Sequence, residues 1–413
     1  MPSLLDRLQS LGVSVGTDSL PAQPEHSRKD QNLAEILGGE DVETIYGPVI
    51  RIIRDYPLGF SHGSIQCGIP ISTSIFQNWA GMSSYPDKKA FLFLDTETSG
   101  LSTGTGTFAF LVGIGIFTDS SLRVIQYFLE SPANEQAMLA QLIKDISGTS
   151  LFVTYNGKSF DIPLLKNRYI MNRIECPFDP YDHADLLHIT RKLYKFFLPE
   201  RNLNIVENEI LNFERTDLEV PGWMVPEIYT EFLRNHDPEP IKRVLYHNEI
   251  DIVSLAALYQ HINFVLETAE LQNIESIPYE VQLTIIRFWL EFGEIEKAQI
   301  LFSSLGEPDS LHDEYSKTAF LLGISLKQNQ QIIEAVPYWN IAAKLDNPFA
   351  YIELAKLYEH IQKEYHPALV YSESAKLIII EKYPRDHSIH MEIEHRIDRL
   401  KRLILEESSQ IPQ

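Results

Sequence analysis

The sequence predicts an α/β fold, a mixed β-sheet flanked by helices, followed by an all-α region. From residue 89, apolar runs suited to strands alternate with segments of helical spacing. After about residue 278 the strand patterns end, and apolar residues recur only at helical spacing. Alternation of the first kind is typical of a sheet covered by helices. A chain of 413 residues is long enough for two such units, each with its own core.

The first unit is expected over residues 44–265, after an N-terminal segment of residues 1–43. In that segment, residues 1–15 have the leucine spacing of a short amphipathic helix, and the rest reads as a polar connector. Strands are predicted in TIYGPVIRII, AFLFLD, TFAFLVGIGIF, RVIQYFL and LFVTYN, and helices in EQAMLAQLIKDI and IPLLKNRYIMNRI. We expect a mixed sheet of about five strands.

The second unit is expected over residues 278–413 as a stack of helical hairpins. Gly323, Ala335, Trp339 and Ala342 have the small-and-aromatic spacing of a tetratricopeptide helix pair. The alternative is that these small residues only allow ordinary helices to pack closely. Such a stack would be available to a protein partner.

Composition limits the classes of function. The net charge of −22 argues against a protein that coats nucleic acid through a broad basic surface. It allows a nuclease, because bound divalent cations reverse the field of a carboxylate site. No apolar stretch is long enough to cross a membrane, and the N-terminus lacks the apolar core of a signal peptide, so a cytoplasmic protein is expected. The two cysteines have no CxxC spacing and indicate neither a disulfide framework nor a zinc site.

The clearest chemical motif is FLFLDTETSG, in which Asp95 and Glu97 end a hydrophobic strand. Their spacing places both carboxylates on one face of the strand. Two like charges there call for a cation, and hard oxygen ligands favour Mg²⁺ or Mn²⁺. Taken alone, such a pair is most often simply solvated.

A second motif is YNGKSFD, directly after a predicted strand. Asn156 and Gly157 are expected to form a turn, Phe160 to anchor in the core, and Asp161 to begin the next helix. By itself, an aspartate at that position is most often only a helix cap.

A third motif is YHNEIDIVSLAALYQHI, a helical stretch with an apolar face. His247 and Asp251 are four residues apart, so both project from one side of the helix. This suits a metal-ligating carboxylate beside an imidazole that accepts a proton from water. In isolation, such a pair is usually a surface hydrogen bond.

In this order, the strand D-x-E, the N-x-x-x-F-D and the helical H-x-x-x-D resemble the three motifs of the DEDD exonucleases. The segments DLLHITRKLYKFFLPERNLNIVE, LEVPGWMVPEIYTEFL and VLYHNEIDIVSLAAL further resemble the YprB-like proteins of ribonuclease-H-like fold, whose members often carry a helical-repeat C-terminus. The resemblance implies a 3′–5′ exonuclease acting on DNA or RNA with two Mg²⁺ or Mn²⁺ ions. It implies that Asp95, Glu97, Asp161 and Asp251 bind the metals and that His247 is the base.

One departure from the family pattern concerns the base. Classical members place a tyrosine four residues before the last aspartate or a histidine five before it, whereas here His247 is at minus four and Tyr246 at minus five. Only the minus-four position shares a helical face well with Asp251, which favours His247.

Substrate contacts are expected from Asn156 and from a local basic cluster that includes Arg191, Lys192 and Arg201. Such a cluster is more often a solvated helix face. Asp182 and Asp185 are expected to be a turn residue and a helix-start residue, outside the metal site. The motifs do not distinguish a DNA substrate from an RNA substrate, or an exonuclease from an endonuclease. The main alternative is a ribonuclease-H-like scaffold with little catalysis whose helical repeats bind protein, while glycoside hydrolysis would leave two of the four acids unexplained.

Overall fold

The computed structural model describes residues 32–409, apart from residues 69–71, 83–90, 101–105, 150, 179–180, 271–275, 309 and 311. The predicted N-terminal helix lies outside the described residues. The described end of the predicted connector carries a short helix, α2 (Leu33–Ile36), and the first strand of the sheet, β1 (Glu40–Thr44). The prediction that the connector extends to residue 43 is therefore wrong, because the backbone of β1 pairs with β2 and so belongs to the sheet.

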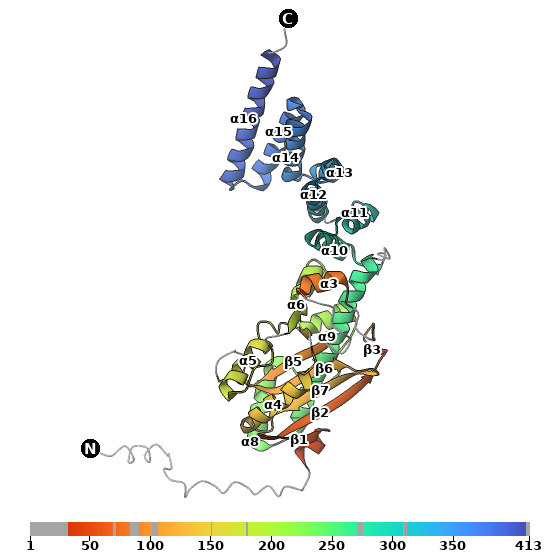
Figure 1. Cartoon of the computed structure of the whole chain (residues 1–413), viewed down its shortest axis with the longest axis vertical. Coiled ribbons are helices and arrows are strands. Elements are labelled where there is room, and N and C mark those ends of the chain that lie inside the picture. Colours follow the sequence, from red (N-terminus) through yellow and green to blue (C-terminus); the bar gives the residue numbers. More distant parts are fainter. Residues whose placement is uncertain are drawn as a thin grey trace, which may run out of the picture.

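Seven strands form one mixed sheet in the order β1-β2-β7-β6-β5-β8-β9 (Figure 1). After β1 the strands are β2 (Gly47–Pro57), β5 (Phe91–Thr98), β6 (Ala109–Phe117), β7 (Ser121–Phe128), β8 (Leu151–Thr154) and β9 (Asp182–Asp185), and a separate hairpin consists of β3 (Phe60–His62) and β4 (Ile65–Cys67). Pairing is antiparallel from β1 to β5 and parallel from β5 to β9. The predicted mixed sheet is confirmed, and it exceeds five strands because β1 and β9, which were not predicted, add one strand at each edge.

The sequence of β5 is continuously apolar up to Leu94 because the strand is covered on both faces of the sheet. Phe91 and Phe93 belong to the hydrophobic core on one face of the sheet, whereas Leu92 and Leu94 belong to the core on the other face. All four are at most 1% exposed. Successive side chains of a strand point to opposite faces, so a strand covered on both faces needs apolar residues at every position. The first polar residue, Asp95, stands where this double cover ends.

Helices cover both faces of the sheet. They are α3 (Ser74–Ala80), α4 (Glu135–Ile146), α5 (Asp161–Asn172), α6 (Leu186–Leu193), α7 (Leu203–Val206), α8 (Val225–Asn235) and α9 (Glu239–Glu270), with shorter turns η3 (Pro132–Asn134), η4 (Glu207–Leu211) and η5 (Gly222–Met224). Apolar residues of α4, α5 and α8 fill the core on one face, and those of α3, α6 and most of α9 fill the other.

Helix α9 lies close against β6 because two positions of that strand are glycine. A Cβ atom at Gly113 would stand 2.2 Å from Oδ1 of Asn248, and one at Gly115 would stand 2.6 Å from Cγ2 of Ile252. Any larger residue would push the helix away. This close approach brings the middle of α9 next to the end of β5.

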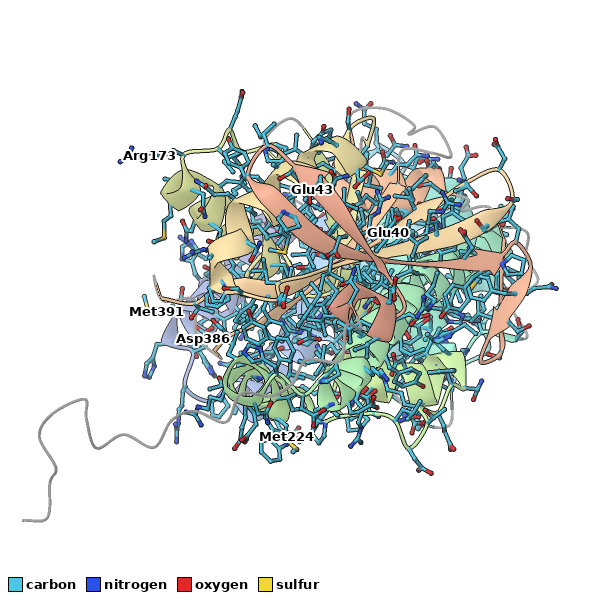
Figure 2. All side chains as sticks on the ribbon, turned by 90° about the horizontal axis from the view of Figure 1, so that it is seen from below. Glu40, Glu43, Arg173, Met224, Asp386 and Met391 are labelled. Atoms are coloured by element: carbon cyan, nitrogen blue, oxygen red, sulfur yellow. The ribbon has the colours of Figure 1, made fainter. Side chains whose placement is uncertain are left out.

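The outer edge of the sheet is protected by charge. Glu40 and Glu43 lie on the edge strand β1, which is seen from below in Figure 2. Glu40 also forms an ion pair with Arg51 of β2, with Nη2 and Oε1 2.6 Å apart. Charged side chains on an edge strand discourage pairing with another chain.

The C-terminal part contains only helices among its described residues. They are α10 (Tyr279–Glu291), α11 (Ile295–Ser304), α12 (His312–Gln328), α13 (Ile332–Lys344), α14 (Pro348–Leu357), α15 (Tyr365–Lys382) and α16 (His387–Ser409), with the π-helical turn η7 (Tyr358–Gln362). Gly323 of α12 faces Trp339 of α13: a Cβ atom there would stand 2.4 Å from Nε1 of the indole. Of the residues singled out in the sequence, Gly323 and Trp339 thus meet at one helix–helix contact.

The sheet domain and the helical region share a hydrophobic core. Helix α10 contacts α6 and α9, and one cluster of buried apolar residues continues from β5 through α9 and α10 to α14. Lys192 of α6 pairs with Glu291 of α10, and its Nζ lies 4.2 Å from the ring centre of Phe288. In the part of the chain that the structure describes, no helix is both long and apolar enough to span a bilayer.

Candidate active site

Asp95 and Glu97 lie near the C-terminal end of β5, just after the part of the strand that is buried on both faces. In the pairing register they lie opposite Gly113 and Leu111 of β6. A β-bulge follows between Glu97 and Thr98, where the strand leaves the regular sheet. The predicted placement of both carboxylates at a strand end is what the structure has.

Asp161 is brought to the same place by the turn after β8. Asn156 adopts a left-handed conformation with φ 67°, and its backbone N–H donates to Oδ1 of Asp185 at 2.7 Å. Asp161 then begins α5 and accepts a hydrogen bond from Oγ1 of Thr96, the residue between the two β5 acids. The sequence-based expectation for this turn agrees with the structure, except that Phe160 is 50% exposed and does not anchor in the core.

Helix α9 contributes His247 and Asp251 one turn apart. Nε2 of His247 lies 3.5 Å from Oε1 of Glu97 and 3.6 Å from Oδ2 of Asp251. One ligand atom from each of these three residues lies within 4.8 Å of the others. Tyr246 points elsewhere, since its hydroxyl accepts a hydrogen bond from the backbone of Thr216 at 3.4 Å. His247, and not Tyr246, is therefore the residue that lies among the carboxylates.

Asn248 connects α9 to Asp95 and was missed in the sequence. Its Nδ2 donates to Oδ2 of Asp95 at 2.8 Å, and its Oδ1 accepts from Nε2 of Gln126 at 2.9 Å. Asn248 is fully buried against Gly113. The hydrogen bonds fix the orientation of the Asp95 carboxylate.

The acids perturb one another electrostatically. Burial, together with the charges of Asp251, Glu97 and Asp161, raises the pKa of Asp95 well above its usual range. Burial also raises the pKa of Glu97 to about 8 and that of Asp161 to about 6. A carboxyl whose pKa rises in this way lacks a sufficient positive partner. For Glu97, the nearby charges of His247 and Arg215 lower the pKa but do not outweigh burial.

His247 is the opposite case. Burial disfavours its protonated form, but the hydrogen bond to Glu219 and the charges of Asp251 and Glu97 outweigh burial and raise its pKa to about 9. In the protein without metal, the imidazole therefore carries a positive charge at neutral pH.

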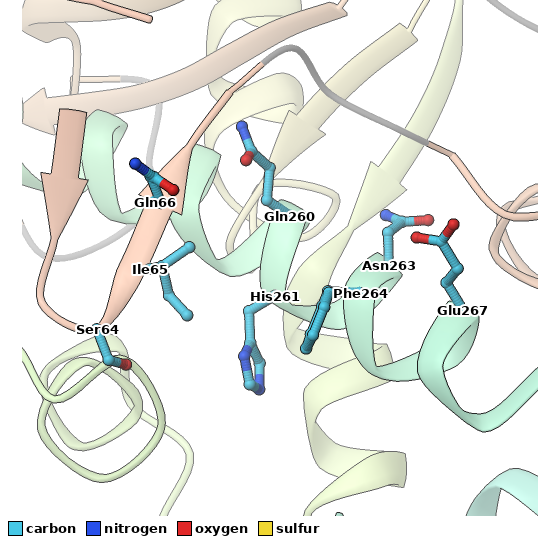
Figure 3. Close-up of a pocket in the computed structure, with 8 residues that line it drawn as sticks. All are labelled: Ser64, Ile65, Gln66, Gln260, His261, Asn263, Phe264 and Glu267. Carbon is cyan, nitrogen blue, oxygen red and sulfur yellow. The ribbon is translucent and has the colours of Figure 1, made fainter. Parts of the chain in front are cut away.

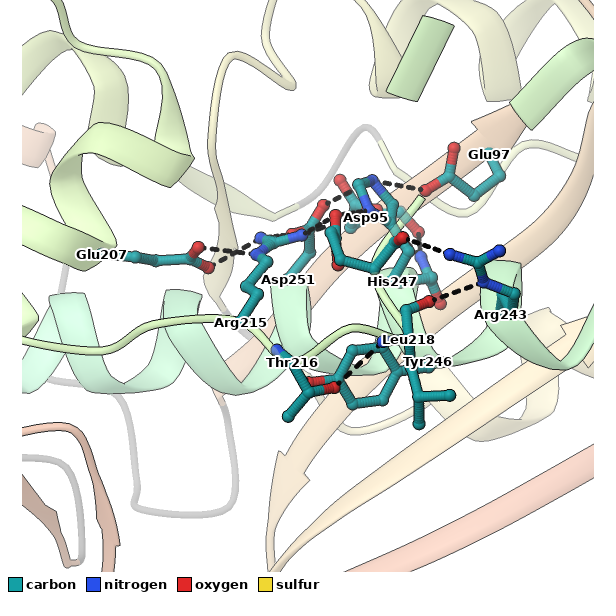
Figure 4. A network of polar contacts seen from close by, with 12 residues as sticks. Asp95, Glu97, Glu207, Arg215, Thr216, Leu218, Arg243, Tyr246, His247 and Asp251 are labelled. Carbon is teal, nitrogen blue, oxygen red and sulfur yellow. Dashed lines mark hydrogen bonds and ion pairs between the residues drawn. The ribbon is translucent and has the colours of Figure 1, made fainter. Parts of the chain in front are cut away.

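The sequence analysis did not identify Arg215, which lies between Glu207 and Asp251 at one side of the cluster (Figure 4). Its guanidinium forms two 2.7 Å hydrogen bonds with Glu207, one of 2.8 Å with Glu219, and an ion pair with Asp251. The Arg215 side chain is 8% exposed and that of Glu207 is 1% exposed. One signal was present: Arg215 is the only Lys or Arg among seven acidic residues between positions 202 and 233, so a buried role as their counter-charge could have been inferred.

A cavity of about 260 Å³ opens beside the carboxylates. It is lined by Asp95, Thr96, Thr98, Gly100, Thr107, Tyr155, Asn156, Phe160, Asp161 and Leu164. Of the predicted substrate-contacting residues, only Asn156 lines it. Lys192 instead binds α10, and Arg201 donates to the backbone carbonyls of Lys195 and Pro199. Arg191 is exposed on α6 and does not line the cavity either.

The two aspartates that were expected outside the metal site lie in β9 and at the start of α6. Asp185 is buried and accepts a hydrogen bond from Leu187 N at 3.1 Å, which confirms it as the helix-start residue of α6. Asp182 begins β9 and is not a turn residue.

A second cavity of about 290 Å³, between β4 and α9, is a packing feature (Figure 3). Three of its polar side chains are bonded within the protein. Gln260 bonds both backbone groups of Gly68, His261 bonds the hydroxyl of Tyr194, and Asn263 bonds Thr73. No carboxylate of the cluster lines it.

Comparisons with known proteins agree with this geometry. A family model described as the RNase H superfamily matches residues 92–263, the segment that holds all the carboxylates of the cluster. The sequence is similar to the uncharacterized protein YprB of Bacillus subtilis (strain 168), with 31% identity over 422 residues that cover 97% of this chain and 99% of YprB. These findings confirm the ribonuclease-H-like fold.

Among solved structures, the chain is similar to the family B DNA polymerase from the hyperthermophilic archaeon Pyrobaculum calidifontis. The TM-score is 0.37 and the sequence identity 13%. The match covers 60% of this chain and 30% of the polymerase, so the chain spans less than a third of that protein's length.

Proposed function

We propose, on the premise that this chain belongs to the YprB family and carries an RNase H superfamily domain, that it is a metal-dependent nuclease. Its finer assignment is a 3′–5′ exonuclease of the DEDD type that hydrolyses phosphodiester bonds in DNA or RNA. The observation that carries the proposal is that Asp95, Glu97, Asp161 and Asp251 come together from β5, α5 and α9, with Asp95 and Asp161 lining a cavity. Three elements distant in sequence supply acids to one place, which a solvated surface pair or a helix cap would not require.

The donor set fits Mg²⁺ or Mn²⁺. Carboxylate oxygens are the ligands that these hard cations prefer, and the raised pKa values of Asp95 and Glu97 mark an uncompensated negative site. Two ions would be held by Asp95, Glu97, Asp161 and Asp251. Once bound, they would supply the activation of water and the charge stabilisation that phosphodiester hydrolysis needs.

The protein's own residues have distinct tasks in this proposal. Asn248 orients Asp95 through its 2.8 Å hydrogen bond. His247 presents Nε2 toward Glu97 and Asp251, where it can accept the proton of an attacking water once the positive charge of bound cations favours the neutral imidazole. Asn156 and the exposed ring of Phe160 line the cavity in which the terminal nucleotide would lie. Arg191, Lys192 and Arg201 receive no such role.

The helical region α10–α16 is proposed to be tetratricopeptide-like and to bind a protein partner or the distant part of a long substrate. The close contact between Gly323 and Trp339 supports the first half of this proposal.

A second candidate is a ribonuclease-H-like scaffold with little catalysis. One observation favours it: Arg215 already pairs with Asp251, so a protein cation occupies one face of a proposed metal ligand.

The deciding experiment is incubation with end-labelled single- and double-stranded DNA and RNA in Mn²⁺, Mg²⁺ or EDTA. A metal-dependent ladder shortened from the 3′ end is expected. Asp251→Asn should lower the rate by several orders of magnitude, and His247→Ala by roughly 10²–10⁴-fold, the usual contribution of proton transfer. Asp55→Asn, in an exposed pair with Arg123 on β2 and β7, is the control that should leave the rate unchanged. Cleavage that is undiminished in EDTA would exclude the metal mechanism, and no cleavage of any substrate would favour the scaffold.

A further inference from the structure

The chain between η4 and α8 forms a second layer behind the carboxylate cluster. Glu219 lies in this layer between His247 and Arg215. Its Oε1 is in contact with Nδ1 of His247 and accepts a 2.8 Å hydrogen bond from Nη1 of Arg215. The backbone is held as well, since Nη2 of Arg243 donates to the carbonyl of Glu219 at 2.8 Å.

Arg215 is itself fixed at its far end. Both of its bonds to Glu207 measure 2.7 Å, and the two side chains are 8% and 1% exposed. A buried guanidinium that donates two hydrogen bonds to one carboxylate has little freedom to rotate. The chain Glu207–Arg215–Glu219 therefore presents one carboxylate oxygen to His247 in a fixed position.

This contact determines which nitrogen of His247 faces the cluster. Nδ1 of His247 lies in contact with Glu219 and 3.2 Å from Nη1 of Arg215. Because the contact with the accepting carboxylate is the closer one, it favours a proton on Nδ1. The other nitrogen, Nε2, is then the one that meets Glu97 at 3.5 Å and Asp251 at 3.6 Å. The tautomer of a neutral histidine is set by the hydrogen bond that its other nitrogen makes. Without Glu219, the ring could turn about its χ angles and place either nitrogen at the cluster.

We infer that Glu219 is a positioning residue for His247, and that Arg215 and Glu207 hold Glu219 in place. The inference rests on the proposed nuclease function, in which His247 handles the proton. Glu219 does not line the cavity beside the carboxylates. Its loss is therefore expected to slow the chemical step without weakening substrate binding.

The kinetic test compares Glu219→Ala and Glu219→Gln with wild type. Glu219→Ala should lower kcat by roughly 10–100-fold, as for other partners of functional histidines, with KM nearly unchanged. Glu219→Gln should retain most of the rate, because its amide oxygen can still accept from both His247 and Arg215. Glu214→Ala, an exposed glutamate of the same segment, is the control expected to match wild type.

A double-mutant cycle then asks whether Glu219 acts through His247. In the His247→Ala background, adding Glu219→Ala should cause little further loss. A full additional loss would overturn the inference, because Glu219 would then act independently. Wild-type kcat in Glu219→Ala would overturn it as well.

A spectroscopic test needs no catalysis. The Hδ1 proton of His247, identified among the 13 histidines by its loss in His247→Ala, should resonate far downfield because of the bond to Glu219. The signal should disappear in Glu219→Ala and move upfield in Glu219→Gln, since a neutral oxygen is the weaker acceptor. An unchanged signal in either variant would overturn the inference. If wild type shows this signal but cleaves nothing, the proposed function fails while the Glu219 contact stands.

Discussion

Asp95→Asn offers a test of the carboxylate cluster that requires no substrate. Burial and the charges of Asp251, Glu97 and Asp161 raise the pKa of Asp95 well above its usual range, so a neutral side chain suits this position when metal is absent. The new amide oxygen can accept the 2.8 Å hydrogen bond that Asn248 now donates to Oδ2. The metal-free variant should therefore melt at or above the temperature of metal-free wild type.

With metal, the order should reverse. A cation at 100 times its dissociation constant that binds only the folded state adds about 2.7 kcal/mol to the free energy of unfolding. For a domain of 150–250 residues, each kcal/mol raises Tm by about 2–4 °C, which gives a rise of roughly 5–11 °C in wild type. Asp95→Asn should lose most of this rise, because a neutral amide is a poor ligand beside three other acids.

Differential scanning calorimetry in EDTA and in Mn²⁺ measures both effects. Asp145→Asn is a suitable control, because Asp145 is a partly buried aspartate bonded to Tyr127 and Gln141, away from the cluster. It should reduce stability equally in both buffers and keep the full gain from Mn²⁺. If Asp95→Asn behaves like Asp145→Asn, then Asp95 is only a structural hydrogen-bonding residue and the site has been misplaced.

Three further predictions follow from the fold. Gly113→Ala should lower the free energy of unfolding in urea by about 1–3 kcal/mol and weaken Mn²⁺ binding, because the new Cβ atom would displace Asn248 from Asp95. An unchanged affinity for Mn²⁺ would contradict this. A chain ending at residue 304 should stay folded. In a chain ending at residue 277, the free energy of unfolding should fall by about 1.5 kcal/mol or more for each core side chain that α10 covers. Equal melting temperatures of the two chains would refute the shared core. Burial lowers the pKa of three histidines to about 4: His62, His183 and His261. Each should contribute stability that is present above pH 6.5 and reduced by about 2 kcal/mol at pH 5, because the unfolded chain takes up protons there and the buried rings do not. The raised pKa values of Asp95, Glu97 and Asp161 act in the opposite direction, so the test is a difference between variants: His261→Asn should lose less stability than wild type between pH 6.5 and pH 4, and an equal pH dependence would count against this.

The parts of the fold and site that the sequence predicted depend on local patterns. AFLFLD is apolar at every position because β5 is covered on both faces, and EQAMLAQLIKDI has the spacing of the helix that it forms. Asp95, Glu97 and Asp161 could be found because each follows directly after such a pattern. The extent of the sheet was underestimated at both edges, because the short polar runs of β1 (EDVET) and β9 (DHAD) carry no apolar alternation.

The parts that were missed depend on contacts between distant segments. Arg215 meets Asp251 across 36 positions, and Asn248 meets Asp95 across 153. No spacing rule links residues so far apart. Lys192 was assigned to phosphate binding because it lies in a basic cluster, but its partner Glu291 is 99 positions away in a region expected to be a separate domain. The same reason explains why residues 278–413 were expected to form a unit with its own core, although α10 lies against α6 and α9.

The continuous helix α9 acts as a rigid rod between two distant surfaces. Asp251 lies near its middle, and Val265, 14 residues further along, lines a cavity together with Val281 of α10. At 1.5 Å per residue these positions are about 21 Å apart, so tilting the rod by about 3° around its far end would displace Asp251 by about 1 Å. A misplacement of that size can cost about 10²-fold in rate. A small shift in how α9 packs against α10 would therefore change the geometry of the carboxylate cluster.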